Sequence, residues 1–126
     1  MDFEISYVKD KAYFIIKTRG ETTPVDIKKS LEMVFGHQNW LDGASILYDN
    51  RLEDLTKLTN HEVKMISDIF IKYNNKLSNS KVAVVMPEDL AFGFARVWEA
   101  HTEGDSTFKT RVFRGIEDAC AWMEEE

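Results

Sequence analysis

The sequence predicts a single α/β domain with a mixed five-stranded sheet and about four helices, in the order ββαβαβαβα. Two observations predict this class. The chain opens with two runs rich in β-branched and aromatic side chains, joined by a short turn, which is typical of an antiparallel hairpin. Three further apolar runs alternate with amphipathic helical stretches, and strands separated by a helix pair in parallel through right-handed crossovers.

The first three predicted elements are a hairpin and a helix. The hairpin joins residues 3–8 to residues 12–18. The helix begins at Pro24 after the capping hydroxyl of Thr23, because a proline at the first helical position needs no N–H. Its apolar residues recur at helical spacing, so one face should lie on the sheet, and Gly36 is placed to end it.

The next strand and helix are predicted from an apolar run and a capping pattern. Residues 45–48 are apolar without polar alternation, as expected of a central strand covered on both faces. The helix begins after Thr59, whose hydroxyl can cap it while Glu62 reaches back in a capping box. We expect this helix to end near Asn75.

The last third of the chain repeats the alternation of strand and helix. Residues 81–86 form a strand that should be central and parallel, and a helix over residues 87–101 follows. Gly93 inside that helix costs about 1 kcal/mol relative to alanine, which indicates close approach of a neighbouring backbone or room for a ligand. A strand over residues 107–113 and a short helix around Ala119 complete the order. The buried stripe of the helix over residues 87–101 is either Leu90, Phe94 and Val97 or the neighbouring Ala91, Ala95 and Trp98.

The length, net charge and cysteine count of the chain argue against several functional classes. With 126 residues and 44% hydrophobic side chains the chain is the size of one domain, and its net charge of −6 argues against nucleic-acid binding. A single cysteine leaves no internal disulfide, and since no Cys/His cluster has metal-site spacing we expect neither metal nor cofactor. No signal peptide or apolar run of the roughly 20 residues that span a bilayer is evident, so a cytoplasmic location is expected.

A cluster of charged and polar residues follows the predicted central strand. Open α/β sheets tend to bind ligands at the carboxyl ends of their strands, so this segment is a candidate interaction surface. We expect its charges to be mainly solvated, and Arg51 either to bind an anion or, preferably, to form an ion pair with a neighbouring acid. No nucleophile is paired with a base, so no catalytic residue is predicted. The candidate partner-binding residues are Asp49, Arg51, Glu53, Asp54, Thr56, Thr59 and His61.

The helix over residues 87–101 carries more aromatic side chains than one face can bury, because successive residues lie about 100° apart. We therefore expect it to line either a self-association surface of a homodimer or a cleft for a small apolar, lipid-like or anionic ligand. The candidate residues are Phe92, Gly93, Arg96 and Trp98.

A resemblance to a known family rests on three segments, which read ILYDNRLEDLTKLTNHE, KVAVVMPEDLAFGFARVWEAH and TRVFRGIEDACAWM. They resemble small bacterial proteins described as STAS-like or SpoIIAA-like, which are mostly of unknown function. These are related in topology to anti-sigma-factor antagonists and to lipid-binding CRAL-TRIO domains. The resemblance covers nearly the whole chain and implies one STAS-like domain over residues 1–126.

The resemblance departs from the antagonists at their switch. Those proteins are regulated by phosphorylation of a serine at the start of the helix after the third strand, and the corresponding residues here are Thr59, Asn60, His61 and Glu62. Phosphate is electrostatically favoured at a helix N-terminus, which leaves Thr56 or Thr59 as an alternative acceptor. We favour the capping role for Thr59.

Two functions follow from the sequence. The first is a non-catalytic binding or regulatory module that engages a protein partner through the segment and helix after the third strand. The alternative is a carrier or sensor of a small apolar or anionic ligand between the helix over residues 87–101 and the sheet. An enclosed apolar cavity near Phe92, Gly93 and Trp98 would favour the carrier, whereas a mainly polar loop without a cleft would favour the partner.

Overall fold

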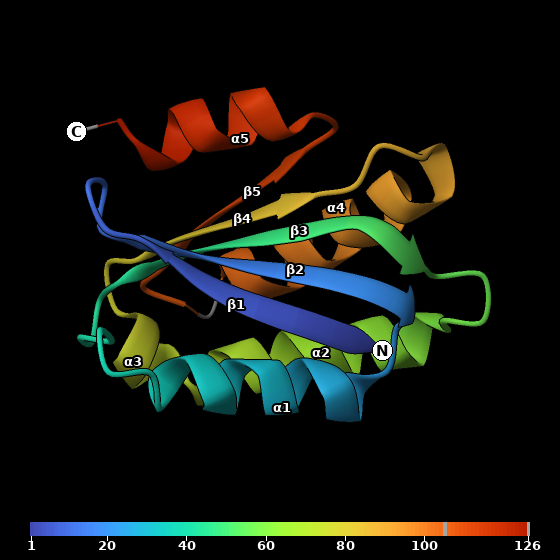
Figure 1. Ribbon diagram of the computed structural model, residues 1–126. Coiled ribbons are helices and arrows are strands. Elements are labelled where there is room, and N and C mark those ends of the chain that lie inside the picture. The colour runs from blue at the N-terminus through green and yellow to red at the C-terminus, as the bar shows by residue number, and fades with distance from the viewer. Residues whose placement is uncertain (105, 126) are drawn as a thin grey trace.

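The chain folds around one five-stranded sheet with helices on both faces (Figure 1). The structure is a computed structural model that describes residues 1–104 and 106–125. Its elements are β1 (Asp2–Val8), β2 (Tyr13–Glu21), α1 (Pro24–Phe35), β3 (Ser45–Asp54), α2 (Asn60–Lys72), α3 (Asn74–Leu77), β4 (Lys81–Val85), α4 (Asp89–Glu103), β5 (Lys109–Phe113) and α5 (Ile116–Met123).

The strand pairing agrees with the predicted mixed sheet. β1 pairs with β2 as the expected antiparallel hairpin, and β2, β3, β4 and β5 follow one another in parallel. β3 is therefore the central strand, as predicted. The predicted order lacks one element, because α2 ends at Lys72 instead of near Asn75. Tyr73 leaves helical geometry at φ −95° and ψ 20°, and the four-residue helix α3 follows.

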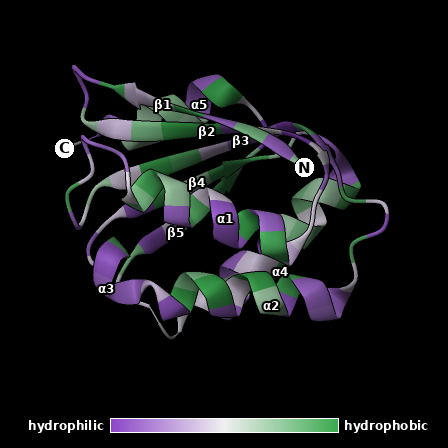
Figure 2. Ribbon diagram, turned by 60° about the horizontal axis from the view of Figure 1, so that its bottom comes forward, coloured by the Kyte–Doolittle hydropathy of each residue, from purple (hydrophilic) through white to green (hydrophobic). Residues whose placement is uncertain are grey.

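The two faces of the sheet are covered by different helices. α1, α2 and α4 bury their apolar residues against one face, where Phe14, Ile16 and Tyr48 of the strands meet them. α5 covers part of the other face around Leu47 and Val85. Figure 2 shows both hydrophobic and hydrophilic residues along α1 and α2, as expected of helices with one buried side.

The predicted helix caps are present. The Asp26 N–H donates to the Thr23 hydroxyl at 3.2 Å at the start of α1, where Pro24 occupies the first helical turn. At the start of α2, the Glu62 N–H donates to the Thr59 hydroxyl and the Thr59 N–H donates to the Glu62 carboxylate, both at 3.1 Å. This reciprocal pair is the predicted capping box, so the boundary between β3 and α2 is set locally.

The structure decides which stripe of α4 is buried. α4 packs against both α2 and β5, and its buried residues include Ala91, Ala95 and Trp98, whereas Leu90 is 56% exposed. A close backbone approach does not explain Gly93, because a Cβ placed there would meet no atom of the described residues within 4 Å.

The capping box provides a test of this boundary. Thr59→Ala removes the hydroxyl that accepts from the Glu62 N–H, so we expect the free energy of unfolding to fall by about 1 kcal/mol. Chemical denaturation followed by circular dichroism measures the change. Lys57→Ala, at an exposed position in the same segment, is the control and should stay within about 0.5 kcal/mol of the wild type. An unchanged unfolding midpoint for Thr59→Ala would contradict the capping role.

Candidate functional site

The strand β3 is longer than predicted, which moves part of the charged cluster from a loop into the sheet. Its second half pairs with β2, with Gly20 opposite Glu53. Asp49 is only 4% exposed, and both carboxyl oxygens of Glu53 are shielded from solvent. The prediction of a mainly solvated charged loop is therefore wrong for these two residues, because strand pairing continues through them.

A β-bulge decides which way Glu53 points. Two residues of β3, Asn50 and Arg51, stand opposite the single residue Thr18 of β2. Strict alternation along β3 would turn Leu52 toward the helices and Glu53 away from them. With the extra residue the parity reverses: Leu52 is 58% exposed, and Glu53 faces α1, α2 and α4 together with Asn50.

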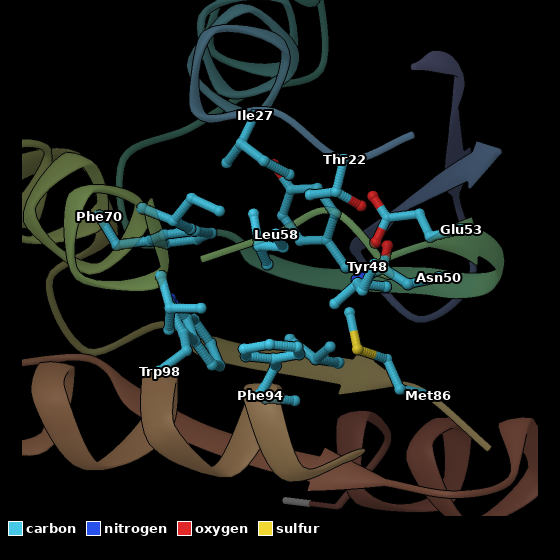
Figure 3. A pocket seen from close by; sticks show the side chains of 15 residues that line it. Thr22, Ile27, Tyr48, Asn50, Glu53, Leu58, Phe70, Met86, Phe94 and Trp98 are labelled. Atoms are coloured by element: carbon cyan, nitrogen blue, oxygen red, sulfur yellow. The ribbon is translucent and has the colours of Figure 1, made fainter. Parts of the chain in front are cut away.

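The inward face of β3 borders a cavity of about 50 Å³ between the sheet, α1, α2 and α4. Its walls are mainly apolar. Figure 3 shows the oxygen atoms of Thr22, Asn50 and Glu53 gathered at one end, with Phe70 and Trp98 on the opposite side. Apolar walls with a few convergent polar groups are typical of sites for small molecules. α2 and α4 contribute Val63, Ile66, Phe70, Phe94, Ala95 and Trp98.

The Glu53 carboxyl is buried without compensation. Neither of its oxygens, nor the Thr22 hydroxyl, has a hydrogen-bond partner among the described residues. Burial raises the pKa of Glu53 to about 7, even though the hydroxyls of Thr22 and Thr18 and the ammonium of Met1 act to lower it. The two hydroxyls are near the carboxyl but out of hydrogen-bonding geometry with it, and Thr18 donates to Asn50 Oδ1 at 2.6 Å instead.

Asp49 and Arg51 form the predicted ion pair. Arg51 donates from Nε and Nη2 to the two carboxylate oxygens of Asp49, each at 2.8 Å. Burial alone would raise the pKa of Asp49, but the hydrogen bonds and charge of Arg51 outweigh burial and hold this pKa below its ordinary value. The Arg51 guanidinium is thus paired with Asp49 of the same strand.

The remaining candidates after β3 lie on the surface. Asp54, Thr56, Thr59 and His61 are exposed. The Thr56 hydroxyl donates to Asp54 Oδ1 at 2.7 Å, and the Thr59 hydroxyl lies 3.2 Å from Glu62 Oε1. A phosphate on either threonine would adjoin a carboxylate, and the like charges would repel.

The four candidate residues on α4 do not form one site. Trp98 lines the cavity, whereas the other three lie outside its wall. The Phe92 ring is covered by the guanidinium of Arg114, whose central carbon lies 4.3 Å from the ring centroid. Arg96 is exposed and pairs with Glu99 at 3.2 Å. A cleft on this helix is therefore formed by the stripe that contains Trp98 and not by the one that contains Phe92.

Of the residues that line the cavity, sequence reasoning named Glu53 and Trp98 as parts of a site and missed the others, among them Thr22, Asn50, Phe94 and Ala95. Phe94 and Ala95 appeared only as alternatives for the buried stripe of one helix. Asn50 is adjacent to the charged cluster, and a longer strand assignment would have drawn attention to it. Nothing in the local pattern around Thr22 marks it, because its role arises from the chain passing the end of β3.

Residues 1–104 and 106–125 contain neither a cluster of metal-binding side chains nor a membrane-spanning helix. No group of three or more His, Cys, Asp or Glu side chains in this part of the chain could hold a metal ion. Likewise, none of the helices described is long and apolar enough to cross a membrane.

Comparisons with known proteins identify the fold. No protein-family model matches the sequence, and no curated protein matches it. Among solved structures, the chain is similar to an uncharacterized protein of the DUF3478 family, with a SpoIIAA-like fold, from Shewanella loihica PV-4. The two are 18% identical, the match covers 97% of this chain and 92% of that chain, and the TM-score is 0.63. The chain thus has a SpoIIAA-like fold, as the resemblance implied.

The buried carboxyl predicts an unusual pH dependence of stability. Since burial raises the pKa of Glu53 from 4.5 to about 7, the native protein keeps a proton that the unfolded chain releases between these values. The free energy of unfolding should therefore fall as the pH rises through this window, by about 3 kcal/mol at most. Glu53→Gln stays neutral, so it should lose this decline and be more stable than the wild type above about pH 7.

Urea denaturation between about pH 5 and about pH 8 measures this difference. Glu4→Gln removes a carboxyl from an exposed position on β1 and should follow the wild-type pH dependence. Parallel curves for Glu53→Gln and the wild type would mean that the carboxyl is solvated in the native protein.

Proposed function

We propose that this protein is a non-catalytic binding module that holds a small, mainly apolar molecule in the cavity between α4 and the sheet, as a carrier or sensor. The observation that carries this proposal is the apolar cavity with an uncompensated carboxyl at one end. A domain of this size does not need such a group for stability, because burying an unpaired polar group is costly. A bound molecule would offset that cost.

The cavity favours the carrier over the partner-binding module. The expected mark of a carrier was an enclosed apolar cavity near Phe92, Gly93 and Trp98. Of these three residues Trp98 borders the cavity, whereas Phe92 and Gly93 do not. Its volume of about 50 Å³ sets the scale of the ligand. A cavity of about 150 Å³ accepts benzene, so only a molecule of a few non-hydrogen atoms suits this volume.

One observation supports a protein partner as a second function. The β-bulge leaves Leu52 exposed beside the hydrophilic segment that contains Thr56, Thr59 and His61. An apolar side chain with a polar surround suits a protein contact. Leu52 and Glu53 are consecutive residues near the end of β3. A ligand that contacts Glu53 in the cavity could therefore affect the surface around Leu52, and a sensor requires such a link between its ligand site and its partner surface.

The carrier proposal predicts a retained ligand. Native mass spectrometry of the protein purified from its own host should reveal a small additional mass. Ala95→Leu adds three carbon atoms to a cavity wall and should abolish that mass, at a stability cost of about 1–3 kcal/mol. Ala100→Leu makes the same change at an exposed position of α4 and should retain it.

The alternatives are distinguishable in the same spectra. Equal added mass in the wild type and in Ala95→Leu would place the bound molecule outside the cavity. A wild-type protein without added mass would contradict a stably held cargo.

A further inference from the structure

We propose that the cavity selects small molecules that carry a primary ammonium group, and that Glu53 is the residue that recognises this group. The inference rests on the proposed function, since it names the class of ligand that the same cavity would take. It is carried by three properties of the polar end of the cavity, namely its hydrogen-bonding atoms, its charge and its distance from other cations.

The polar end offers acceptors that lack donors. The two carboxyl oxygens of Glu53 and the hydroxyl oxygen of Thr22 are buried and have no hydrogen-bond partner among the described residues. An ammonium group has three N–H donors on one atom, whereas an alcohol has one and an ether none. It can therefore donate to all three oxygens at once after a small shift of the surrounding side chains, because each oxygen now exposes almost no surface.

The negative charge of an ionised Glu53 at this end also favours a cationic ligand. No Lys, Arg or His belongs to the described wall of the cavity. The ammonium of Met1 influences Glu53 from nearby, but it lies 3.2 Å from the Asp26 carboxylate, with which it forms an ion pair. A positively charged ligand would supply the missing partner of a buried carboxylate, whereas an anionic ligand would meet a group of its own sign. The anionic ligand that the sequence left open is thereby disfavoured.

The rest of the cavity accommodates a short hydrocarbon. Beyond the polar end its wall is formed mainly by apolar side chains, including Phe94, Ala95 and Trp98, although the Trp98 indole N–H is buried and has no hydrogen-bond partner among the described residues. The volume of about 50 Å³ is about a third of that which holds benzene and scales to about two of its six carbon atoms, so an alkyl chain of at most about three carbon atoms is appropriate. Propylamine is a suitable probe. 1-Propanol has the same number of non-hydrogen atoms, and propionate, with the same number of carbon atoms, has one oxygen atom more.

The groups around Glu53 predict how binding changes with pH. Those that face it are the buried Tyr48 phenol on β3, which burial keeps protonated by raising its pKa, and the Met1 ammonium held by Asp26 of α1. α2 and α4 place no titratable side chain in the described wall. An alkylammonium stays charged to about pH 10, like that of lysine. Ionisation of Glu53 near pH 7 therefore controls the interaction, and amine binding strengthens as the pH rises.

Titrations followed by ¹H–¹⁵N NMR spectra test this selectivity. At about pH 8.5 we expect the wild type to bind propylamine at least about tenfold more tightly than 1-propanol, and propionate most weakly, because a hydrogen-bonded ion pair adds to the same apolar contact. At about pH 6 the affinity for propylamine should fall about tenfold, while that for 1-propanol should not. Glu53→Gln should bind propylamine and 1-propanol alike at both pH values.

Each other outcome has a definite meaning. Equal wild-type affinities for propylamine and 1-propanol, or an amine preference that survives in Glu53→Gln, would overturn the ammonium inference while leaving a small-molecule cavity in place. Tighter binding of propionate would overturn it in favour of an acidic ligand on protonated Glu53. If none of the three probes shifts the resonances of Phe94 and Trp98, both the inference and the proposed function fail. The amide spectrum of each variant reports whether it is folded.

Discussion

The candidate site depends on the β-bulge opposite Thr18. Side chains alternate along a strand, so one extra residue reverses which of the later side chains face the helices. Here the reversal exposes Leu52 and directs the carboxyl of Glu53 toward the apolar cavity. With regular pairing the cavity would have a leucine in its wall and no carboxyl group. Bulges that redirect a side chain in this way are frequent beside functional sites.

Two carboxyl groups on β3 show opposite ways of burying an acid. Asp49 receives two hydrogen bonds from the Arg51 guanidinium and one from the Arg51 backbone N–H, so its charge is compensated and its pKa stays below the ordinary value. Glu53 has no comparable donor in the described chain, so burial dominates and raises its pKa. A compensated pair can be purely structural. An uncompensated buried carboxyl is costly, and such groups concentrate where proteins contact ligands, which is why Glu53 marks the site and Asp49 does not.

The SpoIIAA-like fold explains where a cavity can form, but not what fills it. α1, α2 and α4 lie on one face of the sheet, and the cavity occupies the space where they meet the end of β3. The same fold can carry unrelated activities, because function depends on the particular side chains placed on it. In this chain those side chains are Glu53 and Thr22 at one end and Trp98 at the other.

The sequence by itself determined the features that depend on neighbours along the chain. The hairpin, the central position of β3, the Thr23 and Thr59 caps and an ion pair of Arg51 with a neighbouring acid all follow from local patterns and short spacings. Only the tertiary structure decided the direction of Glu53 and the buried stripe of α4. Both depend on partners distant in sequence: the bulge exists only in the register between β2 and β3, and the stripe is chosen by packing on α2 and β5. The local charge pattern predicts a solvated loop, and only the long-range pairing shows that the carboxyls of Asp49 and Glu53 are buried.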